Sequence, residues 1–366
     1  MIPIRKGEIP MQLNNFPVVL YGAGYAGRRC RQLLDNAGIR ITFFVDDDKV
    51  KQGKEIAGIK VYSYNDLEEY CKKQENVHII LTSIYGAQIY KRLKGIPNIT
   101  IYEMYDWLAE SAIPERTGQN IYSKEELEKF KENVETLKGN LNDEESKKVF
   151  SNLFRYMQTG DGTYISDICS TEEQYFIPEV LEYFKGKKFT ILDAGAYEGE
   201  LIRAILDKDL DVREWYCFEL SKNNYQILMQ NAKENGFRGD QICINKGLWD
   251  QPGNLYIQGE GVFSKAVVEN KSGEVAEVTT IDEYFKEIHV DLIKMDIEGA
   301  EMKALLGGMN VIKRDRPVLA ISIYHTIEDF YTIPQLIFKE LDNYEYYVRH
   351  HSMVFTETVL YAIPKR

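Results

Sequence analysis

The sequence has no long hydrophobic run, no low-complexity tract and no excess of positive charge. No apolar stretch approaches the roughly 20 residues that a membrane-spanning helix needs, so we expect no transmembrane segment. The first residues lack the apolar core of a signal peptide, which predicts a cytoplasmic protein. A formal net charge of -12 argues against a nucleic-acid partner, because such binding needs concentrated positive charge.

The cysteines are few and dispersed. There are five, and none belongs to a Cys-x-x-Cys pair. An odd, scattered set favours reduced thiols packed in the interior over disulfides or a cysteine metal site. The apolar and charged fractions, 44% and 28%, are those of globular proteins, and 366 residues are enough for two domains.

Residues 191–200, with the sequence Ile-Leu-Asp-Ala-Gly-Ala-Tyr-Glu-Gly-Glu, predict a buried strand, a glycine turn and the start of a helix. Open α/β sheets bind nucleotide-like ligands at such turns. The carboxylates of Asp193, Glu198 and Glu200 would repel a pyrophosphate, which binds bare N–H groups. The spacing is also Gly-x-x-x-Gly, which differs from the Gly-x-Gly-x-x-Gly of dinucleotide sites. Both features favour a cationic cofactor with sugar hydroxyls, such as S-adenosylmethionine; the alternative is a tight turn that binds no cofactor.

A second glycine motif lies near the beginning of the chain. An apolar run over residues 17–21 leads into Gly-Ala-Gly-Tyr-Ala-Gly and then a helical stretch. Asp46 ends the next predicted strand nineteen residues after Gly27, a distance that suits a carboxylate binding ribose. The candidate nucleotide site therefore comprises Gly22, Gly24, Gly27 and Asp46. Close packing of helix on strand also needs glycine, so whether this site holds a nucleotide stays open.

Three segments follow from these patterns. Repeated β-α units predict a small Rossmann-like domain over residues 1–112. Residues 113–185 are expected to form a helical linker and the first helices of the second domain, with a capping box at Ser123 and Glu126. Residues 186–366 predict a second α/β domain. Its last two predicted strands, about 344–351 and 357–363, have no helix between them and so indicate a closing hairpin.

The second domain contains another strand that ends in a carboxylate. Glu219 follows Asp193 by 26 residues, which is one β-α-β step, and its two oxygens can accept both ribose hydroxyls. The next predicted strand leads to Gly247 and Leu248, whose backbone can hold the adenine edge. The candidate cofactor-binding residues are Asp193, Gly195, Ala196, Tyr197, Gly199, Glu219, Leu220, Gly247, Leu248 and Tyr175.

The densest group of acidic residues lies between residues 290 and 301. A predicted strand delivers Asp296 to the carboxyl edge of the sheet, and Glu298 and Glu301 follow in the first helical turn, where negative charge is also favourable in itself. His325 ends the next strand and is a candidate base near neutral pH. The candidate catalytic residues are therefore Asp296, His325 and Glu298. Carboxylates suit a divalent cation, but nothing in the sequence demands one, and we expect no metal.

Four stretches of the chain resemble the FkbM family of methyltransferases. They are Asp193–Gly199, Thr279–Asp282, Ile293–Glu301, and the tail around Tyr324-His325 and Arg349-His350-His351. The resemblance covers about residues 143–366, and its most specific part is the run Lys-Met-Asp-Ile-Glu-Gly-Ala-Glu. It implies a class I methyltransferase fold, S-adenosylmethionine as methyl donor, and O-methylation of a hydroxyl on a sugar or another secondary metabolite. The first domain lies outside it and resembles small Rossmann-like domains found beside sugar-modifying enzymes.

The sequence thus predicts an α/β class I methyltransferase with a mostly parallel sheet and a terminal antiparallel hairpin, preceded by a smaller Rossmann-like domain and a helical linker. The expected reaction is methyl transfer from S-adenosylmethionine to a hydroxyl of a sugar, glycan or related metabolite, with Asp296 or His325 as base. A nucleotide or nucleotide-sugar is a candidate ligand of the first domain. The alternatives are a nicotinamide-dependent or nucleotide-sugar enzyme that uses the first domain, and a non-catalytic scaffold that binds adenosine ligands.

Overall fold

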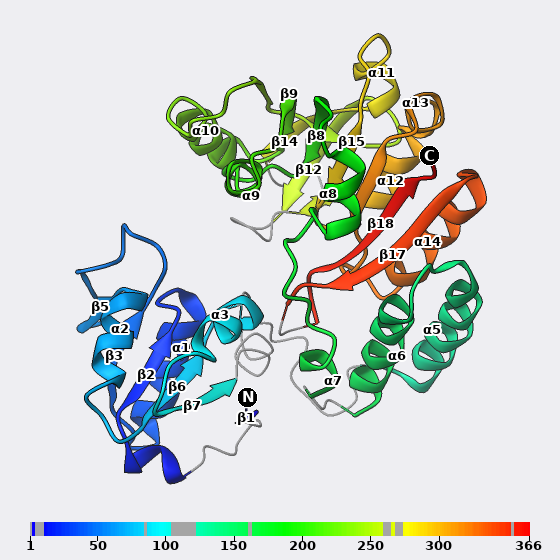
Figure 1. Cartoon of the computed structure of the whole chain (residues 1–366). Helices are drawn as coiled ribbons and strands as arrows, with labels where there is room; N and C mark the ends of the chain where they lie inside the picture. Colours follow the sequence, from blue (N-terminus) through cyan, green and yellow to red (C-terminus); the bar gives the residue numbers. More distant parts are fainter. Residues whose placement is uncertain are drawn as a thin grey trace. The chain divides into compact units, whose positions relative to one another are not determined.

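Alternating apolar strands and helices fold into two units in the computed structural model of the chain (Figure 1). The structure describes residues 2–3, 11–83, 86–103, 122–159, 163–258, 265–267, 274–352 and 355–366. The first unit comprises residues 1–127, 151–171 and 350–356, and the second comprises residues 128–150, 172–349 and 357–366. The expected boundary at residues 112 and 113 lies outside the described residues, so the domain limits 1–112, 113–185 and 186–366 stay a prediction.

The first unit is built on a seven-stranded sheet with the order β1-β7-β6-β2-β3-β5-β4. Its strands are Ile2–Pro3 (β1), Val18–Tyr21 (β2), Ile41–Val45 (β3), Glu55–Ile56 (β4), Ile59–Tyr62 (β5), Val77–Leu81 (β6) and Ile99–Glu103 (β7). Its helices include Met11–Asn15 (η1), Tyr25–Asn36 (α1), Tyr64–Cys71 (α2) and Gly86–Leu93 (α3). The described strand pairs are parallel except β4 with β5.

Both faces of this sheet are covered by helices. Strand β2 alternates its side chains: Val18 and Leu20 pack into one apolar cluster with residues of α1, whereas Val19 and Tyr21 pack into another with residues of α2 and α3. This alternation is what a parallel sheet buried on both sides requires. The predicted Rossmann-like arrangement of the first unit is confirmed.

The second unit is built on a seven-stranded sheet with the order β10-β9-β8-β15-β16-β18-β17. These strands are Phe189–Ala194 (β8), Val212–Phe218 (β9), Asp240–Ile244 (β10), Leu292–Met295 (β15), Val318–Ser322 (β16), Tyr344–His350 (β17) and Thr358–Pro364 (β18). The first five strands in the order are parallel, and β18 runs antiparallel to β16 with β17 beyond it at the edge. The expected antiparallel closing strand is therefore confirmed.

The remaining helices lie before and between these strands in the chain. From residue 124 onward they are Lys124–Leu137 (α5), Lys138–Asn140 (η3), Glu144–Thr159 (α6), Thr163–Ser166 (α7), Pro178–Phe184 (α8), Leu201–Asp207 (α9), Lys222–Asn231 (α10), Ile281–Tyr284 (α11), Glu301–Leu306 (α12), Met309–Asp315 (α13) and Asp329–Glu340 (α14). Helices α8 and α9 pack through Phe184 and Ile205 into an apolar cluster with the fully buried Trp215 of β9. Among the described residues, no helix has the length and hydrophobicity needed to cross a membrane.

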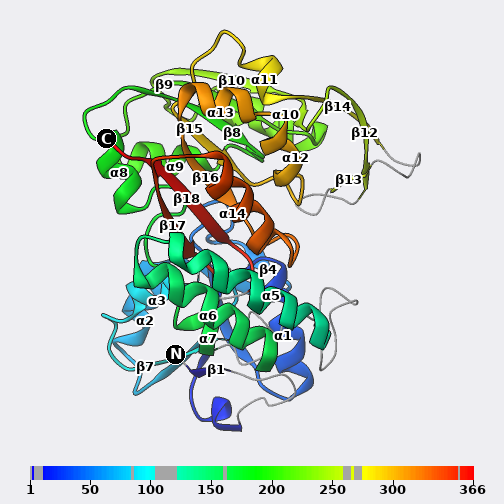
Figure 2. The same ribbon diagram turned by 90° about the vertical axis from the view of Figure 1, so that its right-hand side faces the viewer.

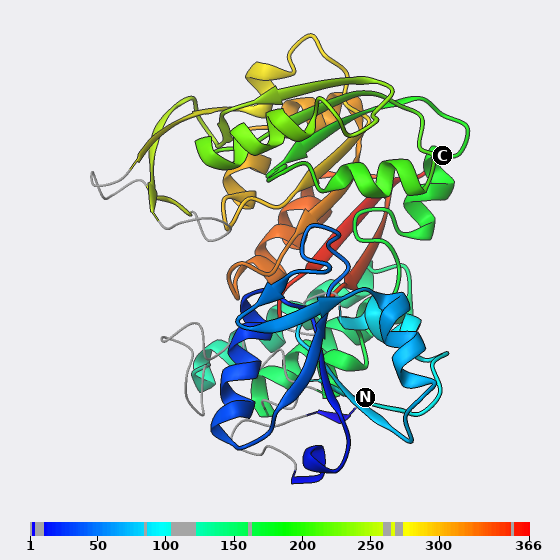
Figure 3. The ribbon, with the colours of Figure 1, turned by 90° about the vertical axis from the view of Figure 1, so that its left-hand side faces the viewer.

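A smaller sheet with the order β11-β14-β12-β13 belongs to the same unit. Its strands are Gly247–Leu248 (β11), Gly253–Gln258 (β12), Lys265–Val267 (β13) and Glu274–Thr279 (β14). Figure 2 shows β12, β13 and β14 as an arm to one side of the seven-stranded sheet, and Figure 3 shows the same arm from the opposite side. The strand character expected for residues 253–258 and 274–280 is thus confirmed.

Two glycines of the first motif are required by packing. A Cβ atom on Gly27 would lie 1.9 Å from the carbonyl oxygen of Gly22, so only glycine lets α1 approach the end of β2. Gly22 has a φ of +114°, and a Cβ there would lie 2.8 Å from the carbonyl oxygen of Thr82. By contrast, no atom lies within 4 Å of a Cβ on Gly24.

We predict that Gly27→Ala destabilises the first unit by about 1–3 kcal/mol, because overpacking forces the backbone apart. The matched control is Gly95→Ala, since a Cβ at Gly95 meets nothing within 4 Å. Urea unfolding of both variants checks this. Equal stability of the two variants would contradict the packing role of Gly27.

Candidate functional site

The central glycine turn and Asp296 meet at the carboxyl edge of the second sheet. Strands β8 and β15 are neighbours, and the N–H of Asp296 donates to the carbonyl of Ala194 at 3.0 Å. Gly195 has a φ of +75°, and a Cβ on it would lie 1.8 Å from the carbonyl oxygen of Asp296. Only glycine permits this contact. The topology changes direction between these two strands, which is where open α/β sheets bind ligands.

A buried ion pair supports the turn from below. Lys294 Nζ lies 2.9 Å from Asp193 Oδ1 and donates to the carbonyl of Gly195 at 2.6 Å. Asp193 Oδ2 accepts from the indole N–H of Trp215 at 3.1 Å. Burial lowers the pKa of Lys294, but Asp193 and Asp296 outweigh that effect and raise the pKa overall. Asp193, predicted to bind the cofactor, is 1% exposed, so it acts by holding Lys294 beneath the turn.

The N–H groups of the turn are engaged within the protein. Gly195 and Ala196 both donate to the carbonyl of Phe218 at 3.0 Å. Tyr197 donates its N–H to Glu219 Oε2 at 2.9 Å. Phosphate sites need N–H groups that point at the ligand. Together with its carboxylates, the turn is therefore a poor place for a pyrophosphate.

Glu219 lies at the end of β9 beside this turn. It is 7% exposed, and burial raises its pKa despite backbone hydrogen bonds that lower it. Its Oε1 accepts from the N–H of Ser221 at 2.8 Å. The side chain of Asn224 also hydrogen-bonds to Glu219, so about one of the roughly four acceptor positions of the carboxylate stays open to a ribose hydroxyl.

The remaining residues that were predicted to bind the cofactor differ in their contacts, burial and backbone conformation. A Cβ on Gly247 would lie 2.8 Å from Leu220 Cδ1, so these two residues are in close contact. Leu248 is buried and can contribute only through its backbone. Gly199 has a φ of +90° and donates its N–H to Ala196, which closes the turn.

Two tyrosines bind the carboxylate of Asp296. The hydroxyl of Tyr175 donates to Asp296 Oδ2 at 2.8 Å, and that of Tyr324 lies 3.2 Å from both Asp296 Oδ1 and Glu357 Oε1. Burial, reinforced by the charge of Asp296, raises the pKa of Glu357 to about 7. Gln174 donates to Glu357 as well, at 2.9 Å. Tyr175, expected to bind the cofactor, thus belongs to the hydrogen bonds around Asp296.

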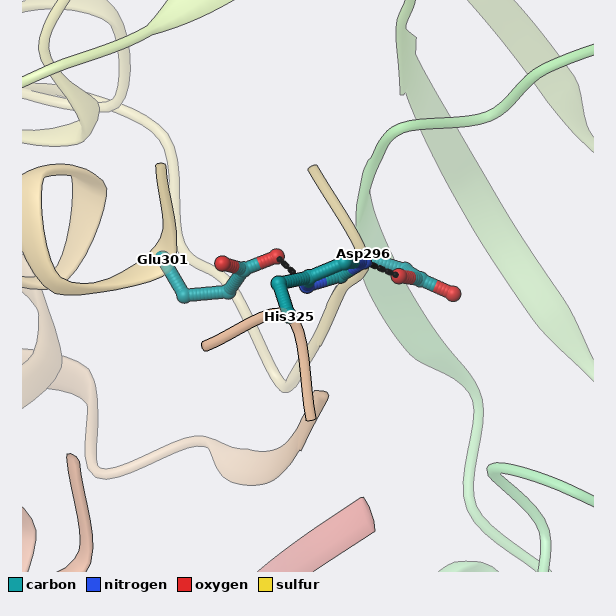
Figure 4. Close-up of side chains that lie close together, drawn as sticks. All are labelled: Asp296, Glu301 and His325. Atoms are coloured by element: carbon teal, nitrogen blue, oxygen red, sulfur yellow. Dashed lines mark ion pairs between the residues drawn. The ribbon is translucent and has the colours of Figure 1, made fainter. Parts of the chain in front are cut away.

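His325 lies between carboxylates on both sides of its ring, as Figure 4 shows for Glu301 and Asp296. Nδ1 is 3.0 Å from Glu301 Oε1, whereas Nε2 is 3.3 Å from Asp296 Oδ1 and 3.7 Å from Glu298 Oε2. Burial lowers the pKa of His325, but Glu301, Asp296 and Glu298 raise it overall to about 10. The structure brings together all three candidate catalytic residues.

Strained backbone marks the same region. Tyr175, Tyr197, Glu298 and Glu357 have φ values of 70°, 50°, 58° and 66°. Residues other than glycine and asparagine rarely adopt this left-handed backbone conformation. Such strained residues cluster at functional sites.

Sequence reasoning missed Lys294, Tyr324 and Glu357 as site residues. Lys294 lies inside a buried strand, and in the sequence it is only the first residue of the run Lys-Met-Asp-Ile-Glu-Gly-Ala-Glu. Tyr324 directly precedes His325, so its position at the carboxyl edge could have been found. Glu357 lies just before β18, and a strand that runs antiparallel to its neighbours begins where they end. The predicted hairpin could therefore have placed Glu357 at the carboxyl edge of the sheet.

The residues of the second candidate nucleotide site also come together, at the carboxyl edge of the first sheet. Asp46 Oδ2 accepts from the N–H of Ala23 at 2.8 Å and lies 3.2 Å from Lys51 Nζ. Asp46 Oδ1 accepts from the N–H of Asp48 at 2.9 Å. The carboxylate thus already holds the loop together.

Comparison with known proteins places both units. Residues 193–348 match the family described as the methyltransferase FkbM domain, and residues 14–105 match the family described as C2185-like, N-terminal. A crystal structure of methyltransferase FkbM from Methylobacillus flagellatus KT is similar over 97% of this chain and 94% of that chain, with a TM-score of 0.57 and 19% sequence identity. No curated protein sequence matches the chain. The similarity confirms the predicted class I methyltransferase fold with a domain before it.

We predict that Lys294→Met destabilises the second unit by roughly 3–5 kcal/mol, because it leaves the carboxylate of Asp193 buried and unpaired. The control is Lys303→Met, which removes an ion pair with Asp250 whose lysine side chain is 47% exposed and should cost at most about 1 kcal/mol. Denaturant unfolding measures both. Similar losses in the two variants would show that the buried pair has no special role.

Proposed function

We propose that this chain, whose residues 193–348 match the methyltransferase FkbM domain, transfers a methyl group from S-adenosylmethionine to a hydroxyl of a sugar, glycan or related metabolite. The observation that carries the choice of cofactor is the acidic turn beside Glu219. Its N–H groups at residues 195–197 are already bonded within the protein, and its carboxylates favour a cation. S-adenosylmethionine supplies an electrophilic methyl group on a sulfonium centre.

Glu219 fits the ribose of this cofactor. Its two oxygens each accept one backbone N–H, from Tyr197 and Ser221, which fixes the carboxylate at the end of β9. A charged acceptor held in this way makes hydrogen bonds that are stronger than neutral ones. The residues present therefore suit an adenosine with free ribose hydroxyls.

Asp296 is the residue that we propose as base. It lies across the Gly195 contact from the turn, so a hydroxyl beside it faces the cofactor side of the sheet edge. The oxygen–methyl bond forms as the sulfur–methyl bond breaks, the sulfur keeps the bonding electron pair, and the hydroxyl proton passes to Asp296. His325 is the alternative from the sequence, but its raised pKa of about 10 keeps it protonated at neutral pH.

Two tyrosines orient the proposed base. Tyr175 donates a hydrogen bond to Oδ2 of Asp296, and Tyr324 lies within hydrogen-bond distance of Oδ1. Holding a reacting group in one geometry contributes to rate through proximity and orientation. We propose that the hydroxyl acceptor binds beside these side chains.

For the first unit we propose a nucleotide or nucleotide-sugar ligand. The supporting observation is Gly24, the motif glycine around which a Cβ meets no atom within 4 Å. A loop glycine without a packing role suits close approach of a ligand to the backbone. A non-catalytic scaffold that binds adenosine ligands is the other alternative. Such a protein would transfer no methyl group, so an assay of turnover distinguishes it from the enzyme.

We predict that Glu219→Gln weakens S-adenosylmethionine binding by about 10- to 150-fold, since a hydrogen bond to a charged group contributes roughly 1.5–3 kcal/mol. Isothermal titration measures the affinity, with Glu234→Gln as the control because Glu234 is an exposed carboxylate of the same unit. Unchanged affinity in Glu219→Gln would remove Glu219 from the site. Binding of NAD in place of S-adenosylmethionine would favour the nicotinamide-dependent alternative.

We predict that Asp296→Asn lowers turnover by about 10²- to 10⁴-fold, the usual contribution of a general base, while cofactor binding persists. Release of S-adenosylhomocysteine in the presence of a panel of monosaccharides and glycans measures turnover. Near-normal turnover in this variant would refute Asp296 as base. No release with the wild-type protein on any hydroxyl acceptor would refute the proposed substrate class.

A further inference from the structure

Three carboxylates surround one imidazole at the carboxyl edge of the second sheet. Glu301, Asp296 and Glu298 lie 3.0, 3.3 and 3.7 Å from the nitrogens of His325. Even with a protonated imidazole, this group carries an excess of negative charge, and Lys294 nearby is committed to Asp193. Crowded carboxylates in a half-buried place call for a counterion.

The two ring nitrogens of His325 face different partners. Nδ1 faces Glu301, which is fully buried and whose Oε1 also accepts the N–H of Ile297 at 2.8 Å. Nε2 faces Asp296 on the other side of the ring (Figure 4), and Glu298 Oε2 lies 3.7 Å from the same nitrogen. A histidine that binds a metal through one nitrogen is commonly held by a carboxylate at the other.

His325 provides an independent indication of a ligand. Its side chain is 5% exposed. Within the part of the chain that the structure describes, Nε2 has no partner in hydrogen-bond geometry, although two carboxylates lie at ion-pair distances from it. Buried polar atoms are nearly always hydrogen-bonded or bound to an ion or water. Nε2, directed between two carboxylates, is therefore oriented as a ligand atom.

We infer that Asp296, Glu298 and His325 Nε2 bind a divalent cation, with Glu301 holding the imidazole from behind. Asp296, Glu301 and His325 already place one possible ligand atom each within 4.8 Å of the others. Adjacent ligands of an octahedral ion lie about 3 Å apart. Asp296 Oδ1 and Glu298 Oε2 lie 3.3 and 3.7 Å from Nε2, which is close to this value. This inference departs from the sequence expectation of no metal.

Two carboxylates and one imidazole suit an ion such as Mn²⁺, which accepts both oxygen and nitrogen ligands. The ion takes the place of the proton on Nε2, because a metal-bound histidine must be neutral there. The role of the ion, unlike its binding, rests on the proposed function. A hydroxyl that coordinated the ion would become more acidic, and Asp296 Oδ2, which already accepts a hydrogen bond from Tyr175, has a second lone pair for its proton.

Manganese binding to the full chain tests this inference. Free Mn²⁺ gives a sharp paramagnetic resonance signal that is lost on binding, so titration yields the number of ions and their affinity. We expect one ion per chain, and at least tenfold weaker binding in Glu298→Gln and in His325→Gln. The control is Glu328→Gln, which removes a carboxylate three residues after His325, directly before α14, and should bind Mn²⁺ like the wild type. Circular dichroism confirms that each variant is folded.

The same samples titrated with S-adenosylmethionine keep the two proposals apart. Wild-type protein that binds the cofactor but no Mn²⁺ overturns the metal site and leaves the proposed function standing. Mn²⁺ binding without cofactor binding does the reverse. Mn²⁺ binding that both cluster variants retain at wild-type affinity also overturns the assignment, because the ion then lies elsewhere.

Discussion

The close contact between Gly195 and the carbonyl of Asp296 determines the geometry of the whole site. A side chain at Gly195 would separate β8 and β15 at their carboxyl ends, and with them the acidic turn and Asp296. Lys294 strengthens this contact from below, because it pairs with Asp193 and donates to the carbonyl of Gly195. Backbone packing and a buried ion pair thus hold the proposed cofactor and acceptor sides together.

Three of the residues that the sequence predicted share one property: each follows a parallel strand. Glu219, Asp296 and His325 come directly after, or shortly after, β9, β15 and β16, and parallel strands end at one edge of a sheet. Apolar runs and turn glycines fix the strands, so residues at their ends can be placed without coordinates. The same logic located both glycine motifs and the closing antiparallel strand.

The sequence placed Tyr175 and Asp193 at the site, but their contacts depend on side chains from distant segments. Tyr175 reaches Asp296 from a loop before α8, and no periodicity predicts where a loop side chain points. Asp193 looks like a ligand-binding carboxylate in the motif, yet its partner Lys294 comes from a strand a hundred residues later. Which groups of a motif face the ligand and which support the backbone is decided by packing across the sheet.

Left-handed backbone conformations at four residues of the proposed site cost stability, and the side chains at these positions belong to the proposed activity. The residues are Tyr175, Tyr197, Glu298 and Glu357. Glycine adopts such backbone angles without steric cost, so glycine at any of the four would relieve local strain. It would also remove a side chain from the proposed cofactor turn, the proposed acceptor side or the proposed metal site. Selection for thermal stability alone would therefore favour glycine at these positions. The resulting variants would be more stable and would lack the proposed activity.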